Sequence, residues 1–155
     1  MSDIVLRRYE RNDLGAIVEL DAECFDPPFR FSREAMRRFA EAENAWVVIA
    51  EVEDRLEGFC IVHMEQAESV RVGYVVTIDV AKAFRRAGLG ERMLTEGERW
   101  TRHQGGAGMM LHVFVKNQGA VRFYERLGYK RVGDQQGFYG PGIDAAMYWK
   151  EFGDT

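Results

Sequence analysis

The sequence has few cysteines and no long hydrophobic run, and each shortage excludes a class of protein. The two cysteines, Cys24 and Cys60, lie far apart and form no Cys-x-x-Cys pair, so we expect a reduced, cytoplasmic protein rather than a disulfide scaffold. No apolar run approaches the roughly 18 residues that a membrane span needs. The first residues, MSDIVLRRYE, lack the hydrophobic segment of a secretory signal, so we also expect no membrane partner.

Basic residues and metal ligands are also scarce. The 21 Lys and Arg residues are outnumbered by 25 Asp and Glu residues, which gives a net charge of −4. Because nucleic-acid affinity rests largely on neutralising phosphates, we expect no nucleic-acid partner. His63 and His103 have no acidic or cysteine neighbour at metal-ligand spacing, and no zinc or calcium loop pattern occurs. We therefore predict no metal.

The composition and periodicity that are present predict one globular α/β domain, which we place at residues 1–155. Apolar residues make up 46% of the chain, enough for a buried core, and no repeat, linker or low-complexity segment interrupts it. The expected strands and helices, in the order β-α-α-β-β-β-α-β-α-β-β, are 5–9, 13–24, 32–42, 46–52, 59–63, 70–80, 88–103, 109–115, 117–127, 129–132 and 145–149. This order predicts a mixed sheet with helices on its faces.

Capping residues and turn residues support several of these boundaries. The expected caps are Asn12 or Asp13, Ser32 and Asn117 at helix N-termini and Gly128 at a C-terminus. The segment FDPPFRF, residues 25–31, contains two prolines and predicts an aromatic loop. Residues 53–58 and the segment QQGFYGPGID, residues 135–144, are interpreted as a turn and a loop between strands.

The most informative stretch joins the predicted strand 70–80 to the predicted helix 88–103, with the sequence RRAGLG from Arg85 to Gly90. A helix N-terminus presents unpaired N–H groups, glycines let a phosphate approach the backbone, and arginines add charged donors. This arrangement suits a pyrophosphate, with a solvated glycine-rich turn as the alternative. The dinucleotide pattern G-x-G-x-x-G is excluded because Met93 replaces its third glycine, and no Gly-Lys-Ser/Thr triplet occurs.

A second motif begins at Asn117, 29 residues after Gly88. The pattern R-x-x-G-x-G, followed at this distance by N-x-x-A-x-x-F-Y-x-x-x-G-Y, resembles the GNAT superfamily of acetyl-CoA-dependent N-acetyltransferases. The resemblance covers nearly the whole chain, from Ile4 to Trp149, and includes the element order. It implies the GNAT fold, a mixed and mostly antiparallel sheet with two central parallel strands that splay apart and helices on both faces.

The resemblance also implies how acetyl-CoA would bind. The turn would hold the pyrophosphate through backbone amides, the strand before it would pair its main chain with the pantetheine arm, and Tyr124 would donate a proton to the leaving thiolate. Helix capping for Asn117, core packing for Phe123 and an ordinary aromatic role for Tyr124 are the alternatives. The implied acetyl-CoA-binding residues are Ile78, Asp79, Val80, Arg85, Arg86, Ala87, Gly88, Leu89, Gly90, Asn117, Ala120, Phe123 and Tyr124.

His112 and Tyr74 bear on which amine is acetylated. Deprotonating a lysine amine (pKa about 10.4) at neutral pH costs roughly 3 kcal/mol more than deprotonating an α-amine (about 7.9), so a weak base such as histidine suits an α-amine. The segments around these two residues resemble N-terminal acetyltransferases of the San (NatE) type, in which a tyrosine and a histidine position and deprotonate the amine through water. The related RimI type usually has glutamate at the position of His112, and the sequence departs from it there.

Each of these two residues also has a structural alternative. His112 could be a core histidine bonded to a carbonyl group. By simple alternation Tyr74 shares a sheet face with Val72, Val76 and Ile78, so core packing is an alternative unless a β-bulge redirects it.

The aromatic loop and the pair Phe138–Tyr139 resemble the walls of the peptide groove in these enzymes, although they could equally anchor loops. The implied substrate-binding residues are Phe25, Pro28, Phe29 and Tyr139. We therefore expect an N-acetyltransferase in which the N-terminal α-amine of a peptide or protein attacks acetyl-CoA directly, with Tyr124, His112 and Tyr74 as catalytic residues. The alternatives are a lysine, polyamine or aminoglycoside acceptor, and a non-catalytic acyl-CoA-binding module. The sequence does not indicate an oligomeric state.

Overall fold

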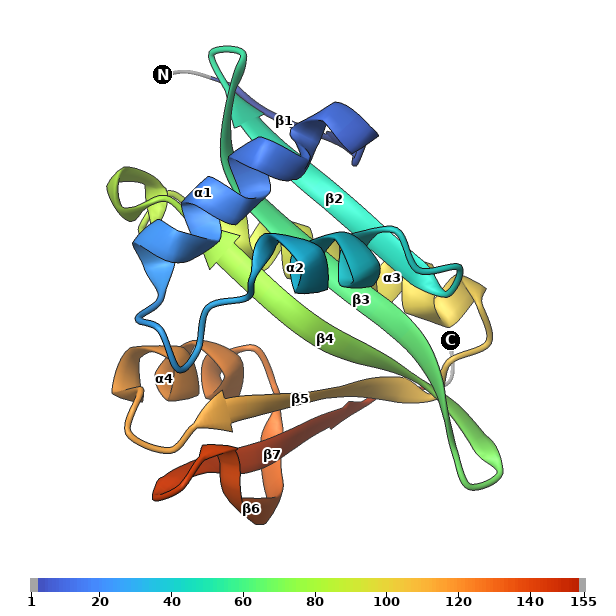
Figure 1. The fold of residues 1–155 in the computed structure, drawn as a ribbon. Helices are drawn as coiled ribbons and strands as arrows, with labels where there is room; N and C mark the ends of the chain where they lie inside the picture. The colour runs from blue at the N-terminus through green and yellow to red at the C-terminus, as the bar shows by residue number, and fades with distance from the viewer. Residues whose placement is uncertain (1–2, 154–155) are drawn as a thin grey trace.

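A seven-stranded sheet in the order β1-β2-β3-β4-β5-β7-β6 organises the chain in the computed structural model, which describes residues 3–153 (Figure 1). All neighbouring strands are antiparallel except β4 and β5, which are parallel. The elements are β1 Ile4–Arg8, η1 Arg11–Asp13, α1 Leu14–Cys24, α2 Arg33–Ala40, β2 Ala45–Val52, β3 Arg55–Ala67, β4 Val70–Val80, η2 Lys82–Phe84, α3 Leu89–His103, β5 Gly108–Phe114, α4 Gln118–Arg126, β6 Lys130–Gly140 and β7 Ile143–Glu151. The predicted order of strands and helices and the predicted fold class are confirmed.

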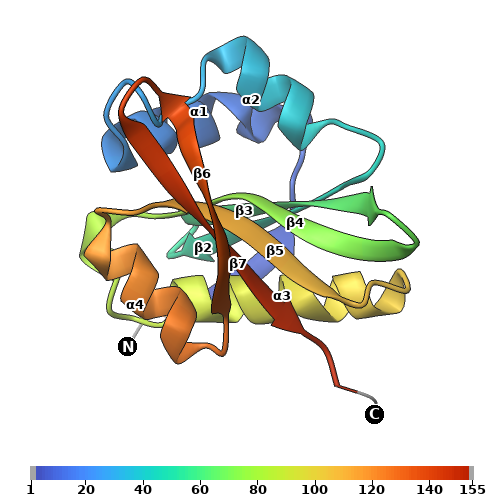
Figure 2. The same cartoon turned by 90° about the horizontal axis from the view of Figure 1, so that it is seen from below.

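Helices cover both faces of the sheet. Figure 2 shows α1 and α2 on one side and α3 and α4 on the other. The pleat of β2 serves both layers, because Val47 and Ile49 pack with α1 and α2 whereas Val48 and Ala50 pack with α3. Each large apolar side chain buried in these two layers contributes roughly 1.5–3 kcal/mol. No helix among residues 3–153 is long and apolar enough to cross a membrane.

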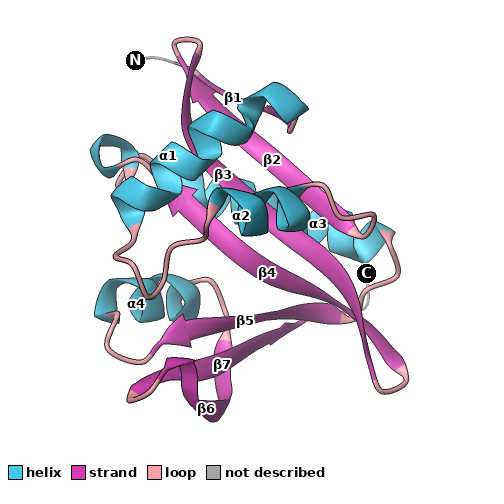
Figure 3. Ribbon diagram, in the orientation of Figure 1, coloured by secondary structure: helices cyan, strands magenta, loops and turns pink. Residues whose placement is uncertain are grey.

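The two parallel strands meet at one end only. Their pairing consists of Gly73 with Met109 and Tyr74 with Met110, and beyond these pairs β4 and β5 diverge, as the strand arrows in Figure 3 show. The close approach at the junction requires glycine, because a Cβ at Gly73 would lie 2.5 Å from Thr101 Oγ1 and 2.7 Å from Met109 Sδ. The splay leaves the β5-facing main chain of residues 75–80 without a strand partner.

A β-bulge in β4 changes which side chains share a face. Ile61 pairs with Thr77 and Val62 with Val75, so Val76 is the extra residue. As a result Val75 and Ile78 both pack in the α3 layer, whereas Val76 packs in the α1–α2 layer. The alternation that grouped Tyr74 with Ile78 is therefore wrong, because the bulge interrupts it.

Several predicted boundaries need correction because strands continue through segments interpreted as turns. The β2–β3 turn consists of Glu53 and Asp54 alone, both with positive φ (53° and 64°), rather than residues 53–58. The strand β6 likewise runs to Gly140, with register irregularities, through most of the segment expected to be a loop. Asp13 occupies the N-cap position of α1, but its carboxylate bonds Arg7 and the Glu10 amide instead of capping that helix. The other predicted caps are confirmed in the structure, at Ser32, Asn117 and Gly128.

Candidate active site

The glycine turn opens α3 with unpaired backbone donors. Gly88 has φ +83° and precedes the first helical residue, and a Cβ added there would meet nothing within 4 Å. The first amides of the helix have no acceptor within it and are available to a ligand. Arg85 Nε donates to the Val80 carbonyl (3.1 Å), whereas the exposed guanidinium of Arg86 bonds no group within residues 3–153. These residues form a cradle that a phosphate group fits.

The helix α4 lies against this turn. A Cβ at Gly90 would meet the ring of Phe123 at 3.2 Å, so the turn and Phe123 are in close contact. The side chain of Asn117 accepts from the Ala120 amide (3.1 Å) and caps α4. Asn117 is therefore a helix cap, and its additional bond to acetyl-CoA stays a prediction.

Tyr74 and His112 form a hydrogen-bonded pair next to the point where β4 and β5 separate. Tyr74 Oη lies 2.7 Å from His112 Nδ1, and His112 Nε2 lies 3.0 Å from Gln135 Oε1. Because an amide oxygen can only accept, Nε2 carries the proton, and Nδ1 accepts from the tyrosine hydroxyl. The three side chains thus form one chain of hydrogen bonds across β4, β5 and β6.

The surroundings keep this imidazole neutral. Burial lowers the pKa of His112 from its usual value, and the bond to Gln135 opposes that shift. The ring of Phe138 stacks on the imidazole with centroids 4.0 Å apart and planes 7° apart. Burial, with a smaller effect of the Glu65 charge, raises the pKa of Tyr74 to about 12. At neutral pH the pair is a neutral imidazole that accepts from a neutral phenol.

Tyr124 is held in the core beside the splay with its hydroxyl available. It is 7% exposed, its ring contacts Phe123 and Tyr129, and its hydroxyl has no hydrogen-bond partner among the described residues. Burial raises the pKa of Tyr124 well above its usual value, with a smaller effect of Cys60. Such a phenol keeps its proton at neutral pH and can donate it.

Aromatic side chains from three distant segments form a wall next to the Tyr74–His112 pair. Phe29, in the loop between α1 and α2, packs on Phe114 of β5 (centroids 4.9 Å apart) and on Tyr139 of β6 (5.0 Å). Tyr139 in turn contacts Phe138 at 4.9 Å. Two predicted wall residues take no part in these ring contacts. Phe25 is half-buried and forms no ring contact among the described residues, and Pro28 is exposed.

Two residues of the site depart from the sequence reasoning. Gln135 was missed, because it lies in a segment that was interpreted as a loop and no local pattern marks it as a partner of His112. Asp79, an expected acetyl-CoA ligand, has its carboxyl group buried in the sheet interior, where it accepts from Thr77 Oγ1 (2.6 Å). Only the main chain of Asp79 can face the splay.

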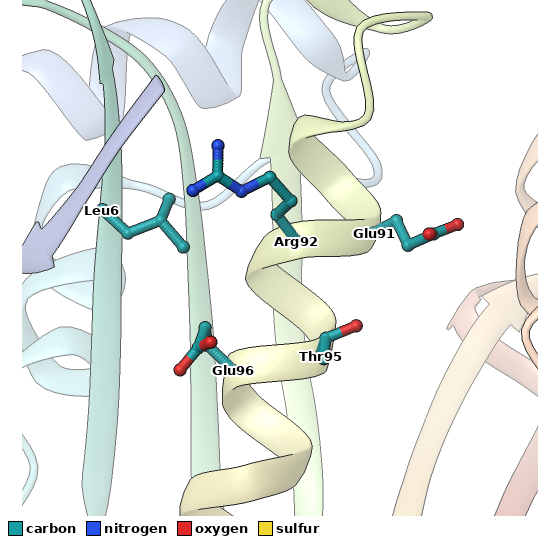
Figure 4. Close-up of a pocket in the computed structure, with 5 residues that line it drawn as sticks. All are labelled: Leu6, Glu91, Arg92, Thr95 and Glu96. Carbon is teal, nitrogen blue, oxygen red and sulfur yellow. The ribbon is translucent and has the colours of Figure 1, made fainter. Parts of the chain in front are cut away.

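A surface pocket between β1 and α3 contains none of these side chains (Figure 4). It is lined by Leu6, Glu91, Arg92, Thr95 and Glu96. Within residues 3–153 no three His, Cys, Asp or Glu side chains are grouped so that they could hold a metal ion.

Comparison with known proteins decides the family. The model of the Acetyltransferase (GNAT) family matches residues 14–129, which include the turn, the Tyr74–His112 pair and Tyr124. The chain belongs to the GNAT family. This GNAT protein is therefore an acyltransferase enzyme, and its co-substrate is acetyl-CoA, which the cradle at Gly88 and the unpaired edge of β4 fit.

Two relatives of this GNAT enzyme are named as N-acetyltransferases of different kinds, and a solved structure shares its fold. An N-alpha-acetyltransferase of Saccharolobus solfataricus is 27% identical over 94% of this chain and 91% of that protein. A 5-NmdU N-acetyltransferase of Pseudomonas phage PaMx11 is 31% identical over 77% of this chain and 81% of that protein. Arabidopsis thaliana NAA60, solved with a bisubstrate analogue, has a TM-score of 0.85 at 19% identity, with 99% of this chain and 100% of that chain covered. That last likeness confirms the fold.

Proposed function

We propose that this enzyme transfers the acetyl group of acetyl-CoA to the N-terminal α-amine of a peptide or protein. The observation that carries the proposal is the 2.7 Å hydrogen bond between Tyr74 Oη and His112 Nδ1 at the splay. The names of relatives such as the Saccharolobus solfataricus N-alpha-acetyltransferase support it.

The pair supplies a route for the proton that the amine loses. As the amine nitrogen attacks, its proton passes, through a water molecule, to Tyr74 Oη, while the phenol gives its own proton to His112 Nδ1. In the resulting imidazolium, Nε2–H continues to donate its hydrogen bond to Gln135 Oε1. No phenolate accumulates, which matters because the pKa of Tyr74 is about 12.

The lowered pKa of His112 favours an α-amine over a lysine amine. A base that is weaker than ordinary histidine suits an amine that is already about half neutral near pH 8. A lysine amine would arrive protonated at neutral pH, and no anionic base is present in the hydrogen-bonded chain to remove that proton.

The remaining parts of the site bind and orient the co-substrate. Acetyl-CoA, when bound, supplies the activated carbonyl carbon that the amine attacks. Residues Arg85–Gly90 hold its pyrophosphate through amides and guanidinium groups, and the free main-chain edge at residues 75–80 orients its arm and polarises the carbonyl. The unbonded hydroxyl of Tyr124 gives its proton to the leaving sulfur.

The aromatic wall receives the acceptor. Phe29, on the loop after α1, and Tyr139, on β6, pack edge to face and form one side of the approach to His112. Flat apolar rings suit the first side chains of an extended peptide, whose backbone can run along this wall.

A CoA-release screen tests the proposal. The acceptors are short N-terminal peptides, free lysine, spermidine, an aminoglycoside and 5-NmdU. We expect peptides to be preferred, and His112→Ala to lower kcat/KM for them by about 10² or more with acetyl-CoA affinity unchanged. The matched control is His103→Ala, at the exposed end of α3, which leaves kcat/KM unchanged. Preference for another amine refutes the acceptor class, and equal activity of both variants refutes the role of His112.

A further inference from the structure

Two acidic side chains are completely buried beside the site, and the mechanism above uses neither. Asp21, in the last turn of α1, is 0% exposed, and Asp79, near the end of β4, is 1% exposed. Neither carboxyl group forms an ion pair among residues 3–153, although burying a charged carboxylate alone is costly. Their presence needs another explanation.

The two carboxyl groups face each other. Asp21 Oδ1 and Asp79 Oδ2 are the only buried side-chain oxygen or nitrogen atoms among the described residues that have no hydrogen-bond partner, and the Asp21 carboxyl group lies within hydrogen-bonding reach of the Asp79 carboxyl group. Two buried carboxylates in contact cannot both stay charged, so we infer that Asp79 keeps a proton, which it can donate to Asp21 Oδ1. Burial and the contact with Asp21 raise the pKa of Asp79 well above its usual value, in agreement with this arrangement.

The groups around the pair do not replace that proton. Thr77 Oγ1 donates to the other oxygen of Asp79. The thiols of Cys24 on α1 and Cys60 on β3 are neutral, because burial raises the pKa of each. Arg85 is the positive charge that acts on Asp79, but its Nε bonds the Val80 carbonyl instead.

The remaining oxygen of Asp21 fixes the aromatic loop. Asp21 Oδ2 accepts from the Phe31 amide at 2.8 Å, so one carboxyl group at the end of α1 closes the segment 25–31. That segment presents Phe29 to Phe114 and Tyr139. Through the shared proton the loop is joined directly to β4, the strand whose free edge faces the splay.

We propose that Asp21 and Asp79 are positioning residues for the acceptor: their proton-sharing carboxyl pair, buried between α1 and β4, locks the Phe25–Phe31 loop in the position that binds the acceptor. The pair touches neither the amine nor the acyl group. It sets the affinity for the acceptor while leaving acetyl-CoA binding to the glycine turn.

The variants Asp79→Ala and Asp79→Asn distinguish a role in positioning the loop from a general contribution to the stability of the fold. The alanine variant leaves Asp21 Oδ1 without a partner, so we expect the Phe31 amide to exchange with solvent at least about tenfold faster and trypsin to cut faster after the exposed Arg30. The asparagine variant offers a permanent N–H donor to Asp21 and should restore near wild-type protection and cleavage. These loop measurements hold whichever amine the enzyme acetylates, although the acceptor argument rests on the proposed function.

Kinetics complete the test. We expect Asp79→Ala to raise KM for the preferred acceptor about tenfold and to change KM for acetyl-CoA less than twofold, with Asp79→Asn close to wild type. The matched control is Glu98→Gln on α3, which removes the charge of a partly buried carboxylate that accepts from Tyr129 and Lys150, and it should leave both KM values unchanged. If Asp79→Ala does not fold, Thr77→Val gives a milder disturbance of the same pair, with faster Phe31 exchange expected.

Three results overturn the proposal. The first is an unchanged Phe31 exchange rate in Asp79→Ala, or in Thr77→Val if that variant is used. The second is Phe31 exchange and cleavage after Arg30 that are as fast in Asp79→Asn as in Asp79→Ala. The third is a loosened loop with acceptor KM unchanged. Failure of the peptide screen, in contrast, contradicts the proposed acceptor and leaves the loop measurements intact.

Discussion

Replacing Gln135 by glutamate should move the pH dependence of the reaction, because Gln135 Oε1 is the acceptor 3.0 Å from His112 Nε2. A carboxylate in place of the amide favours the imidazolium and raises the pKa of His112. The attraction between unit charges about 4 Å apart is about 1 kcal/mol in water and about 4 kcal/mol at an effective dielectric constant of 20. Since His112 is only half-buried, we take a value near the lower limit, about 1.4 kcal/mol, which is one pH unit.

The sign of the effect follows from the proposed role of His112 as a base. A raised pKa keeps the imidazole protonated to higher pH, so the acidic limb of the kcat/KM profile for Gln135→Glu should move upward by about one pH unit. At pH values below the new limb, activity falls about tenfold relative to wild type, and above it the two enzymes converge. Initial rates of CoA release between pH 5.5 and 9 with a peptide acceptor measure the acidic limb of the wild type and of Gln135→Glu.

The neighbouring Gln136 provides the control. It is exposed on the same strand and adds the same charge when changed to glutamate, but it makes no bond to His112. We expect Gln136→Glu to leave the limb in place. An unshifted profile in Gln135→Glu, or equal shifts in the two variants, would show that His112 is not the titrating base.

Three further predictions concern the acyl end, the turn and the junction of the splay. Tyr124→Phe should lower kcat by about 10² and leave the calorimetric Kd for acetyl-CoA unchanged, because only the donated proton is lost. Gly88→Ala should raise KM for acetyl-CoA about tenfold, whereas Gly105→Ala, with nearly the same φ (+82° against +83°) and equally open space, should not. Gly73→Ala should lower the free energy of unfolding by about 2–3 kcal/mol in urea titrations, because its Cβ would overlap Thr101 Oγ1, and an unchanged midpoint would contradict that packing.

Local patterns were enough to predict the order of elements but not the ends of the strands. Alternating apolar residues and caps act within one turn or one strand, and the structure confirms the element order that they predict and the cap at Ser32. The end of β6 could not be predicted, because Gly137 and Gly140 signal a turn locally, and both adopt positive φ (66° and 141°), yet Gly140 still pairs with Ile143 of β7. The strand therefore resumes pairing with its neighbour after a local irregularity, which only the partner strand determines.

The candidate site was predictable where a motif covers it and not where distant side chains meet. The turn Arg85–Gly90 and the residues of α4 are local motifs, so their positions follow from the sequence. The partners of His112 and Asp79 do not, because Gln135 and Asp21 are 23 and 58 residues away along the chain. Gln135 reaches His112 only through the register of β5 with β7 and of β7 with β6. Asp21 reaches Asp79 only through the packing of α1 on β4.

The splay explains why the tyrosine–histidine pair and the proposed binding edge for acetyl-CoA occur at the same place. Tyr74 is in the last residue pair that β4 forms with β5, opposite Met110, and His112 is two residues further on the same face of β5. Beyond this point no main-chain bonds join the strands, so a side-chain bond between the two residues can span the opening gap. If the strands stayed paired, the main-chain edge at residues 75–80 would be occupied and no acyl group could lie beside the imidazole. The overlap that a Cβ at Gly73 would cause therefore bears on catalysis as well as stability, since it would shift the point at which the strands begin to separate.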